Sequence, residues 1–210
     1  MHTNLQKNIF PRLLLTLAGL ILLTSCSALR APQREAAQLY LLDASAAIRQ
    51  SPIQRNLVLA VSMPRASAGF DTPQMAYQQR DHQLQYFAVN RWLDTPARML
   101  EPLLLQALEQ SRGFSAVVRT PSMVTADVRL DTELLRLQQD FSSHPSRVQL
   151  SLRVQLIDVS AKRVLASKIF AVVEDAPSDD ARGGVIAANR LLQQLLGQVA
   201  EFCVSAAVKP

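Results

Sequence analysis

The segment from Arg147 to Asp158 constrains the fold of this 210-residue chain more than any other. From Arg147 to Leu156 its residues alternate between polar and apolar. The apolar positions are Val148, Leu150, Leu152, Val154 and Leu156. Because successive side chains of a strand point to opposite faces, this pattern predicts a strand with one packed face and one wet face. A turn at residues 160–161 leads to a matching strand over residues 164–173, so we expect an antiparallel meander.

Shorter apolar runs predict further strands around this meander. They cover residues 40–42, 56–61, 74–78, 83–87, 117–119 and 128–137. The runs at 74–78 and 83–87 are expected to form a hairpin. Over 128–137 the alternation changes parity near Leu134, which predicts a β-bulge. Residues 62–73 contain two prolines and a glycine, so we expect a loop there.

A first amphipathic helix is predicted after Asp94, because leucines between residues 100 and 108 recur at the helical period. Asp94 is the expected N-cap and Gly113 the expected stop. Pro102 lacks an amide hydrogen and clashes with the preceding turn of a helix. We therefore expect a kink there, or a fresh start of the helix.

A second amphipathic helix is predicted at the carboxyl end of the chain. Its apolar stripe extends from Ala188 to Val199, and Asp179 and Asp180 precede it as capping residues. Two such helices and a half-wet sheet predict an α+β fold, in which a mixed, largely antiparallel sheet carries both helices on one face.

The amino terminus has the layout of a secretory signal. Lys7 and Arg12 come first, an apolar run covers residues 13–23, and Cys26 follows Leu-Thr-Ser. This resembles the lipobox of bacterial lipoproteins, in which the cysteine receives diacylglycerol and, after cleavage, an N-acyl chain. The apolar run is shorter than the ~20 residues that span a bilayer, which argues against an uncleaved transmembrane helix. We expect residues 1–25 to be a cleaved signal peptide, 26–37 a lipidated tether and 38–208 a single domain.

Charge and cysteine content narrow the class of partner. The net charge falls from +5 to +3 once Lys7 and Arg12 leave with the signal peptide. No basic run with interleaved aromatic residues occurs, so nucleic acid is not an expected partner. A mildly basic surface is compatible with anionic lipid headgroups. Cys203 is then the one remaining thiol, expected to be buried and inert, with an intermolecular disulfide as the alternative.

The residues that could carry chemistry do not form a recognisable catalytic pattern. His82 and His144 lack a metal-binding spacing, and no metal or cofactor other than the lipid on Cys26 is expected. No nucleophile elbow accompanies the histidines, and Gly183-Gly184 lacks the frame of a phosphate-binding loop. The sequence therefore predicts a protein that is not an enzyme.

Trp92 is the single tryptophan, and we expect it to fill the core in front of the first helix. Met63, Phe70 and Met75 lie in or beside the expected loop, where periodicity does not explain apolar residues. They either fold back onto the body or offer a contact for a partner or lipid.

The order of these parts resembles a known family. It includes the lipobox, Tyr40-Leu41-Leu42-Asp43, the run Leu57 to Pro64, Leu84-Gln85-Tyr86-Phe87 and the turn Arg91-Trp92-Leu93-Asp94-Thr95-Pro96, before a leucine-rich helix, a meander and a closing helix. This is similar to the ABC-type transport auxiliary lipoprotein family, which includes paraquat-inducible protein C. The resemblance marks Tyr40, Trp92 and Asp94 as its structural motif.

The resemblance also implies a role. Such lipoproteins accompany a protein with an MCE (mammalian cell entry) domain and an inner-membrane permease and ATPase, which move lipids or other hydrophobic molecules between the two membranes of a Gram-negative bacterium. Ser27, where an aspartate retains lipoproteins in the inner membrane, implies an outer-membrane lipoprotein that faces the periplasm. A homo-oligomer is left open. The alternative function is a structural adaptor for outer-membrane assembly.

Overall fold

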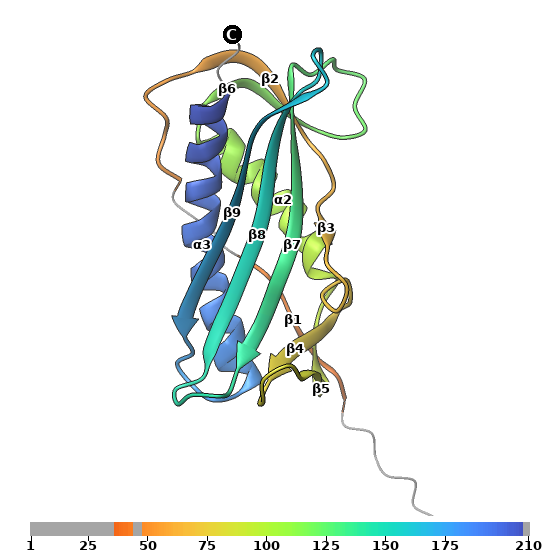
Figure 1. The fold of residues 1–210 in the computed structure, drawn as a ribbon, viewed down its shortest axis with the longest axis vertical. Coiled ribbons are helices and arrows are strands. Elements are labelled where there is room, and N and C mark those ends of the chain that lie inside the picture. The colour runs from red at the N-terminus through yellow and green to blue at the C-terminus, as the bar shows by residue number, and fades with distance from the viewer. Residues whose placement is uncertain (1–35, 44–47, 208–210) are drawn as a thin grey trace, which may run out of the picture. The chain divides into compact units, whose positions relative to one another are not determined.

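The structure, a computed structural model, describes residues 36–43 and 48–207, and the residues from Ala37 on form one folded unit. The predicted signal peptide, Cys26 and most of the tether lie outside the described residues. A nine-stranded mixed sheet forms one layer, and the two described helices cover one of its faces (Figure 1). This confirms the predicted α+β class.

A long meander forms one side of the sheet. It consists of three antiparallel strands: β7 (Val128–Asp140), β8 (Arg147–Asp158) and β9 (Arg163–Asp175). The predicted bounds of β8 are confirmed, and its apolar side chains are buried while the alternate ones stay partly exposed. The register of β7 shifts between Leu134 and Arg136, which confirms the predicted bulge.

The other edge of β7 is shared by three short parallel strands in succession. These are β2 (Arg55–Val61), β3 (Arg65–Ala66) and β4 (Gln74–Gln78). Beyond β2 lies the parallel strand β6 (Phe114–Arg119), and beyond β4 lie β5 (Leu84–Trp92) and then β1 (Gln38–Tyr40). The sheet thus divides into a β2–β6 branch at one end of β7 and a β4–β5–β1 branch at the other.

Local patterns misplaced several of these short strands. β1 begins two residues before the predicted strand, and the predicted 62–73 loop contains β3. Strands β5 and β6 are longer than expected because each pairs with a distant segment, β1 and β2 respectively, whose position local periodicity does not reveal. The predicted β4–β5 hairpin is confirmed.

The helix α2 (Pro96–Gln110) differs from its prediction at both ends. Thr95, not Asp94, is the N-cap, and its side chain makes no capping bond. The helix continues through Pro102 without a fresh start. At its end Arg112 adopts the left-handed conformation (φ 52°), whereas a Cβ on Gly113 would overlap Val204 of the second helix. Gly113 therefore permits close packing and does not supply the left-handed turn.

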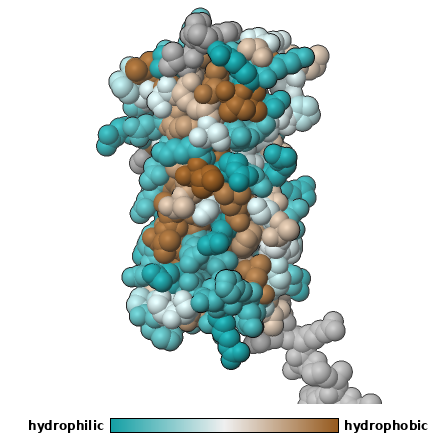
Figure 2. Space-filling view, in the orientation of Figure 1, coloured by the Kyte–Doolittle hydropathy of each residue, from teal (hydrophilic) through white to brown (hydrophobic). Residues whose placement is uncertain are grey.

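The helix α3 (Ala181–Ala206) begins as predicted. The carboxylate of Asp180 accepts a hydrogen bond from the Gly183 amide at 2.7 Å. Its apolar stripe packs against β8 and β9, where Leu191, Leu192 and Leu195 are almost completely buried. The opposite face of the sheet is largely hydrophilic, with exposed apolar side chains in patches between the polar ones (Figure 2).

Candidate functional site

The amino-terminal edge of the sheet brings two residues of the predicted motif together. Tyr40 in β1 pairs in register with Trp92 in β5. Trp92 is 4% exposed, which confirms its predicted place in the core, and Tyr40 packs against the same core. The Trp92 amide donates to the Pro73 carbonyl at 2.8 Å, and the Leu93 amide donates to the Tyr40 carbonyl at 2.8 Å. This edge joins the first described residues to the sheet.

Asp94 closes the turn that follows. Its carboxylate accepts a hydrogen bond from the Thr95 amide at 2.7 Å and lies 3.5 Å from the Arg98 guanidinium. Both Asp94 and Arg98 are well exposed, so this ion pair contributes little to stability. Asp94 therefore orients the turn into α2 without acting as its N-cap.

The three apolar residues in and beside the predicted loop have different environments. Met75 is buried in β4, and Phe70 packs partly against the core. Met63 stays 47% exposed and lines an open hollow of about 690 Å³ with Arg65 and the first residues of α2. Met75 and, in part, Phe70 therefore fold back onto the body. Met63 alone of the three stays accessible, and a contact of Met63 with a partner or lipid stays a prediction.

A second hollow lies along α3. It has a volume of about 660 Å³ and is formed by residues 48–55 and the outer face of the carboxyl-terminal half of α3. Gln193, Gln194 and Gln198 line it, and nothing lies within 4 Å of the position that a Cβ of Gly197 would take. The Arg55 guanidinium donates to the Val204 carbonyl at 3.3 Å, so this cation lies near the negative end of the helix dipole.

A buried polar cluster fastens the β7–β8 turn to the start of α3, and local sequence patterns did not reveal it. The Gln139 side-chain amide donates to the Ser146 hydroxyl at 2.9 Å and to the Asp180 carbonyl at 3.1 Å. Gln139 is 4% exposed and Ser146 is fully buried. A Cβ on Gly184 would overlap Oε1 of the Gln139 side chain, so the glycine makes room for this side-chain amide.

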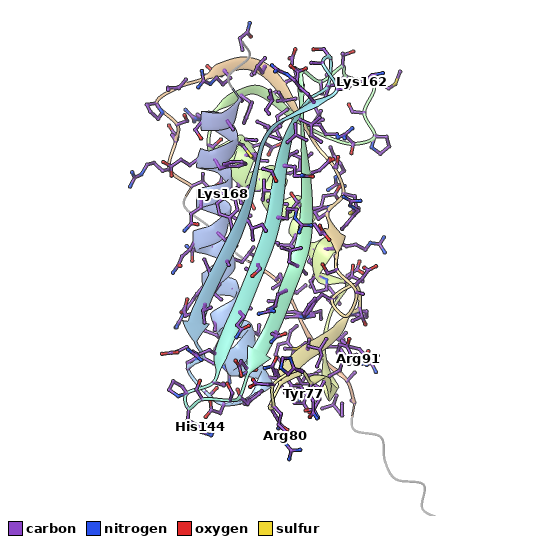
Figure 3. All side chains as sticks on the ribbon, in the orientation of Figure 1. Tyr77, Arg80, Arg91, His144, Lys162 and Lys168 are labelled. Carbon is purple, nitrogen blue, oxygen red and sulfur yellow. The ribbon has the colours of Figure 1, made fainter. Side chains whose placement is uncertain are left out.

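Among the described residues, the nearest approach to a catalytic arrangement lies on the surface of the same turn. The His144 ring nitrogen Nδ1 lies 2.9 Å from Asp179, whose other oxygen accepts the Ser146 amide at 2.6 Å. The hydrogen bonds from the Ser146 amide and from His144 lower the pKa of Asp179 to about 2. His144 projects outward at the end of the molecule where Tyr77 and Arg80 lie, far from Lys162 (Figure 3). The Ser146 hydroxyl accepts the hydrogen bond from the Gln139 side chain. We assign Ser146, His144 and Asp179 a structural role, which is to hold the β7–β8 turn against the start of α3, and we call these three residues the latch.

Other candidate residues have structural surroundings as well. Cys203 is fully buried, and burial raises the pKa of its thiol to about 12. His82 occupies a left-handed position (φ 63°) in the β4–β5 turn. Within residues 36–43 and 48–207, no three potential metal ligands cluster. No helix in that part of the chain is both long enough and apolar enough to cross a membrane.

The order of elements and the Tyr40–Trp92 pairing can be compared with known proteins. The family model of the ABC-type transport auxiliary lipoprotein component matches residues 40–200, which include β2 to β9 and most of α3. The chain belongs to this family of ABC-type transport auxiliary lipoproteins. It is a family of auxiliary lipoproteins and is not a known enzyme family, and lipoproteins belong to the cell envelope.

Solved structures share the fold of this auxiliary lipoprotein. Protein XCC0632 from Xanthomonas campestris is 23% identical with a TM-score of 0.72, over 80% of this chain and 96% of that one. An uncharacterized protein is 16% identical with a TM-score of 0.63, over 80% and 99%. The hypothetical protein CT253 from Chlamydia trachomatis is 10% identical with a TM-score of 0.52, over 72% and 99%. A comparison with curated protein sequences found no match to this auxiliary lipoprotein.

Proposed function

We propose that this auxiliary lipoprotein is anchored through a lipid on Cys26 and serves, without enzymatic activity, as the periplasmic accessory component of an MCE/ABC-type system. That system moves lipids or other hydrophobic molecules between the inner and outer membranes. The family match over residues 40–200 carries the proposal, because the family is defined by association with an ABC transport system. The lipobox that ends at Cys26 supports the anchor.

The anchor has a direct chemical test. Cells that produce the wild-type protein are grown with labelled palmitate, and we expect the label in a processed band. The Cys26→Ala protein is expected to remain unlabelled and unprocessed, because the thioether to diacylglycerol has no sulfur from which to form. Labelling or normal processing of Cys26→Ala would refute the anchor. Cys203→Ala is the matched control, since that thiol is buried and should not affect labelling.

The membrane and the partner need separate tests. Ser27 predicts that the mature protein sediments with outer membranes, and that Ser27→Asp moves it to the inner-membrane fraction. For the partner, cross-linking in cells followed by purification is expected to recover an MCE-domain protein. Recovery of an outer-membrane barrel protein in its place would support the structural-adaptor alternative. The same cross-linking tests homo-oligomer formation, because a second copy would appear at twice the mass.

A further inference from the structure

Three leucines form an exposed apolar patch beside the amino-terminal edge of the sheet. Leu39, Leu41 and Leu93 keep 58%, 51% and 56% of their surface exposed. Together these three residues are called the leucine patch. Other residues of the same segments point inward, since Tyr40 packs on the core and Leu42 and Trp92 are buried. The exposure of the leucines therefore follows from the alternation of strand side chains and not from local disorder of the fold.

The pairing of β1 with β5 makes these leucines contiguous. Leu39 lies in register with Arg91, so both point to the same face of the sheet. The same parallel register, continued by the bond from the Leu93 amide to the Tyr40 carbonyl, places Leu93 opposite Leu41. Arg91 is exposed and projects from the side of the β4–β5–β1 branch (Figure 3). The patch is thus three leucines with one guanidinium at its border.

The segment that carries the patch is held firmly in place. The Asn189 side chain of α3 donates to the Leu41 carbonyl at 3.2 Å and accepts from the Asp43 amide at 2.8 Å. These two bonds act on the backbone, so they leave the leucine side chains outside. A cluster of large apolar side chains held outward on a folded surface marks an interaction site.

The position of the patch along the chain indicates its partner. Eleven residues separate Cys26 from Gln38, the first residue of β1. A chain of that length spans at most about 40 Å when fully extended. If Cys26 carries the lipid of the proposed function, the patch is confined near the bilayer surface at a high effective concentration. Weak apolar contacts then suffice to populate a docked state.

We propose that the leucine patch docks the folded domain on the phospholipid bilayer that holds its anchor. Leu39, Leu41 and Leu93 enter the boundary between headgroups and acyl chains, and Arg91 binds headgroup phosphate. Leucine side chains suit that boundary, and guanidinium is the cation best matched to phosphate oxygens. This rests on the proposed function, because the anchor brings the patch to the membrane. The lipid alone would attach the domain without orienting it. Docking through the leucine patch would also fix the orientation of the domain relative to the membrane.

The test places a fluorescent probe in the patch. The mature lipidated Leu41→Trp protein is reconstituted in vesicles of phosphatidylethanolamine and phosphatidylglycerol with or without brominated acyl chains, which quench nearby tryptophan. Val173→Trp is the matched control, because Val173 is 55% exposed on the edge strand β9. The signal of buried Trp92, measured in the parent protein, is subtracted. We expect the Leu41→Trp probe to be quenched at least about twofold more than the control probe.

The outcomes separate the patch from the anchor. Equal quenching of the two probes, in proteins that float with the vesicles, would overturn the patch proposal and leave the anchor intact. A Leu41→Trp emission that is blue-shifted but insensitive to bromine would also overturn it, because a second copy or a partner protein then covers the patch. Failure of the parent protein to float would refute the anchor itself. Adding Leu39→Ser and Leu93→Ser to the probe protein should reduce its quenching. Ile169→Ser should not, because Ile169 is an equally exposed apolar residue on β9, outside the patch.

Discussion

Gly184 and Gln139 offer a sharp test of how α3 is seated on the sheet. A Cβ at position 184 would overlap Oε1 of the Gln139 side chain and lie 2.8 Å from the Cδ of the same side chain. Gln139 cannot move away freely, because its side chain is buried and donates to the Ser146 hydroxyl and the Asp180 carbonyl. Gly184→Ala must therefore either overpack this site or displace the amide from its two acceptors.

The expected change in the free energy of unfolding follows from two possible costs and one gain. Overpacking a buried site costs about 1–3 kcal/mol, and each lost hydrogen bond costs about 1 kcal/mol. Replacing glycine with alanine inside a helix returns up to about 1 kcal/mol. Since the alanine causes one of these two costs and not both, we expect Gly184→Ala to lower the free energy of unfolding by about 1–2 kcal/mol, which corresponds to a fall in Tm of about 2–8 °C for a domain of this size.

The assay is urea unfolding followed by far-ultraviolet circular dichroism, on the mature sequence with Cys26→Ser. In a Gln139→Ala background the overlap is absent, so Gly184→Ala should become neutral or stabilising by up to about 1 kcal/mol. Gly197→Ala in the same helix is the matched control, because open space surrounds that position. The reasoning is wrong if Gly184→Ala costs the same with and without the Gln139 amide, or if Gly197→Ala is as damaging.

The latch carboxylate, the buried thiol and the buried tryptophan give three further predictions. Asp179 has a pKa of about 2 when folded and an ordinary value of 3.8, so its contribution is complete above 3.8 and disappears as the pH falls toward 2. Urea midpoints measured against pH should therefore fall less steeply in this range for Asp179→Asn than for wild type. Cys203, whose pKa is about 12, should react with a thiol reagent only at the rate of unfolding. Trp92→Ala should lower the free energy of unfolding by about 3–5 kcal/mol, measured by urea titration.

The periodic parts of the fold were predictable because their cause is local. The alternation from Val148 to Leu156 gave the bounds of β8, and the apolar stripe from Ala188 to Val199 identified the middle of α3. Each pattern reports which side of an element meets the core, and that information is contained in neighbouring residues.

The remaining parts depend on distant pairings. β3 is two residues long and exists because Arg65 and Ala66 pair with Glu133 and Leu134 of β7. The helix α2 begins at Pro96 with Thr95 as its N-cap, because the Asp94 carboxylate binds the Thr95 amide and not an amide within the helix, a choice that residue type alone does not indicate.

The candidate site shows the same division between local and distant causes. Family order identified Tyr40 and Trp92, and the structure places them side by side. The Gln139–Ser146–Asp180 cluster was missed because its members are contributed by β7, the β7–β8 turn and the cap of α3. The exposure of Leu39, Leu41 and Leu93 depends equally on a pairing between segments about fifty residues apart.

The two bonds of Asn189 also have a mechanical meaning. Any tension carried by the chain ahead of Gln38 first loads the three residue pairs between β1 and β5. It next reaches the backbone at Leu41 and Asp43, where one amide side chain ties the chain to a long helix. The load then spreads through α3 to the strands on which that helix rests. A body built in this way can be pulled from its first strand while its central sheet keeps its shape.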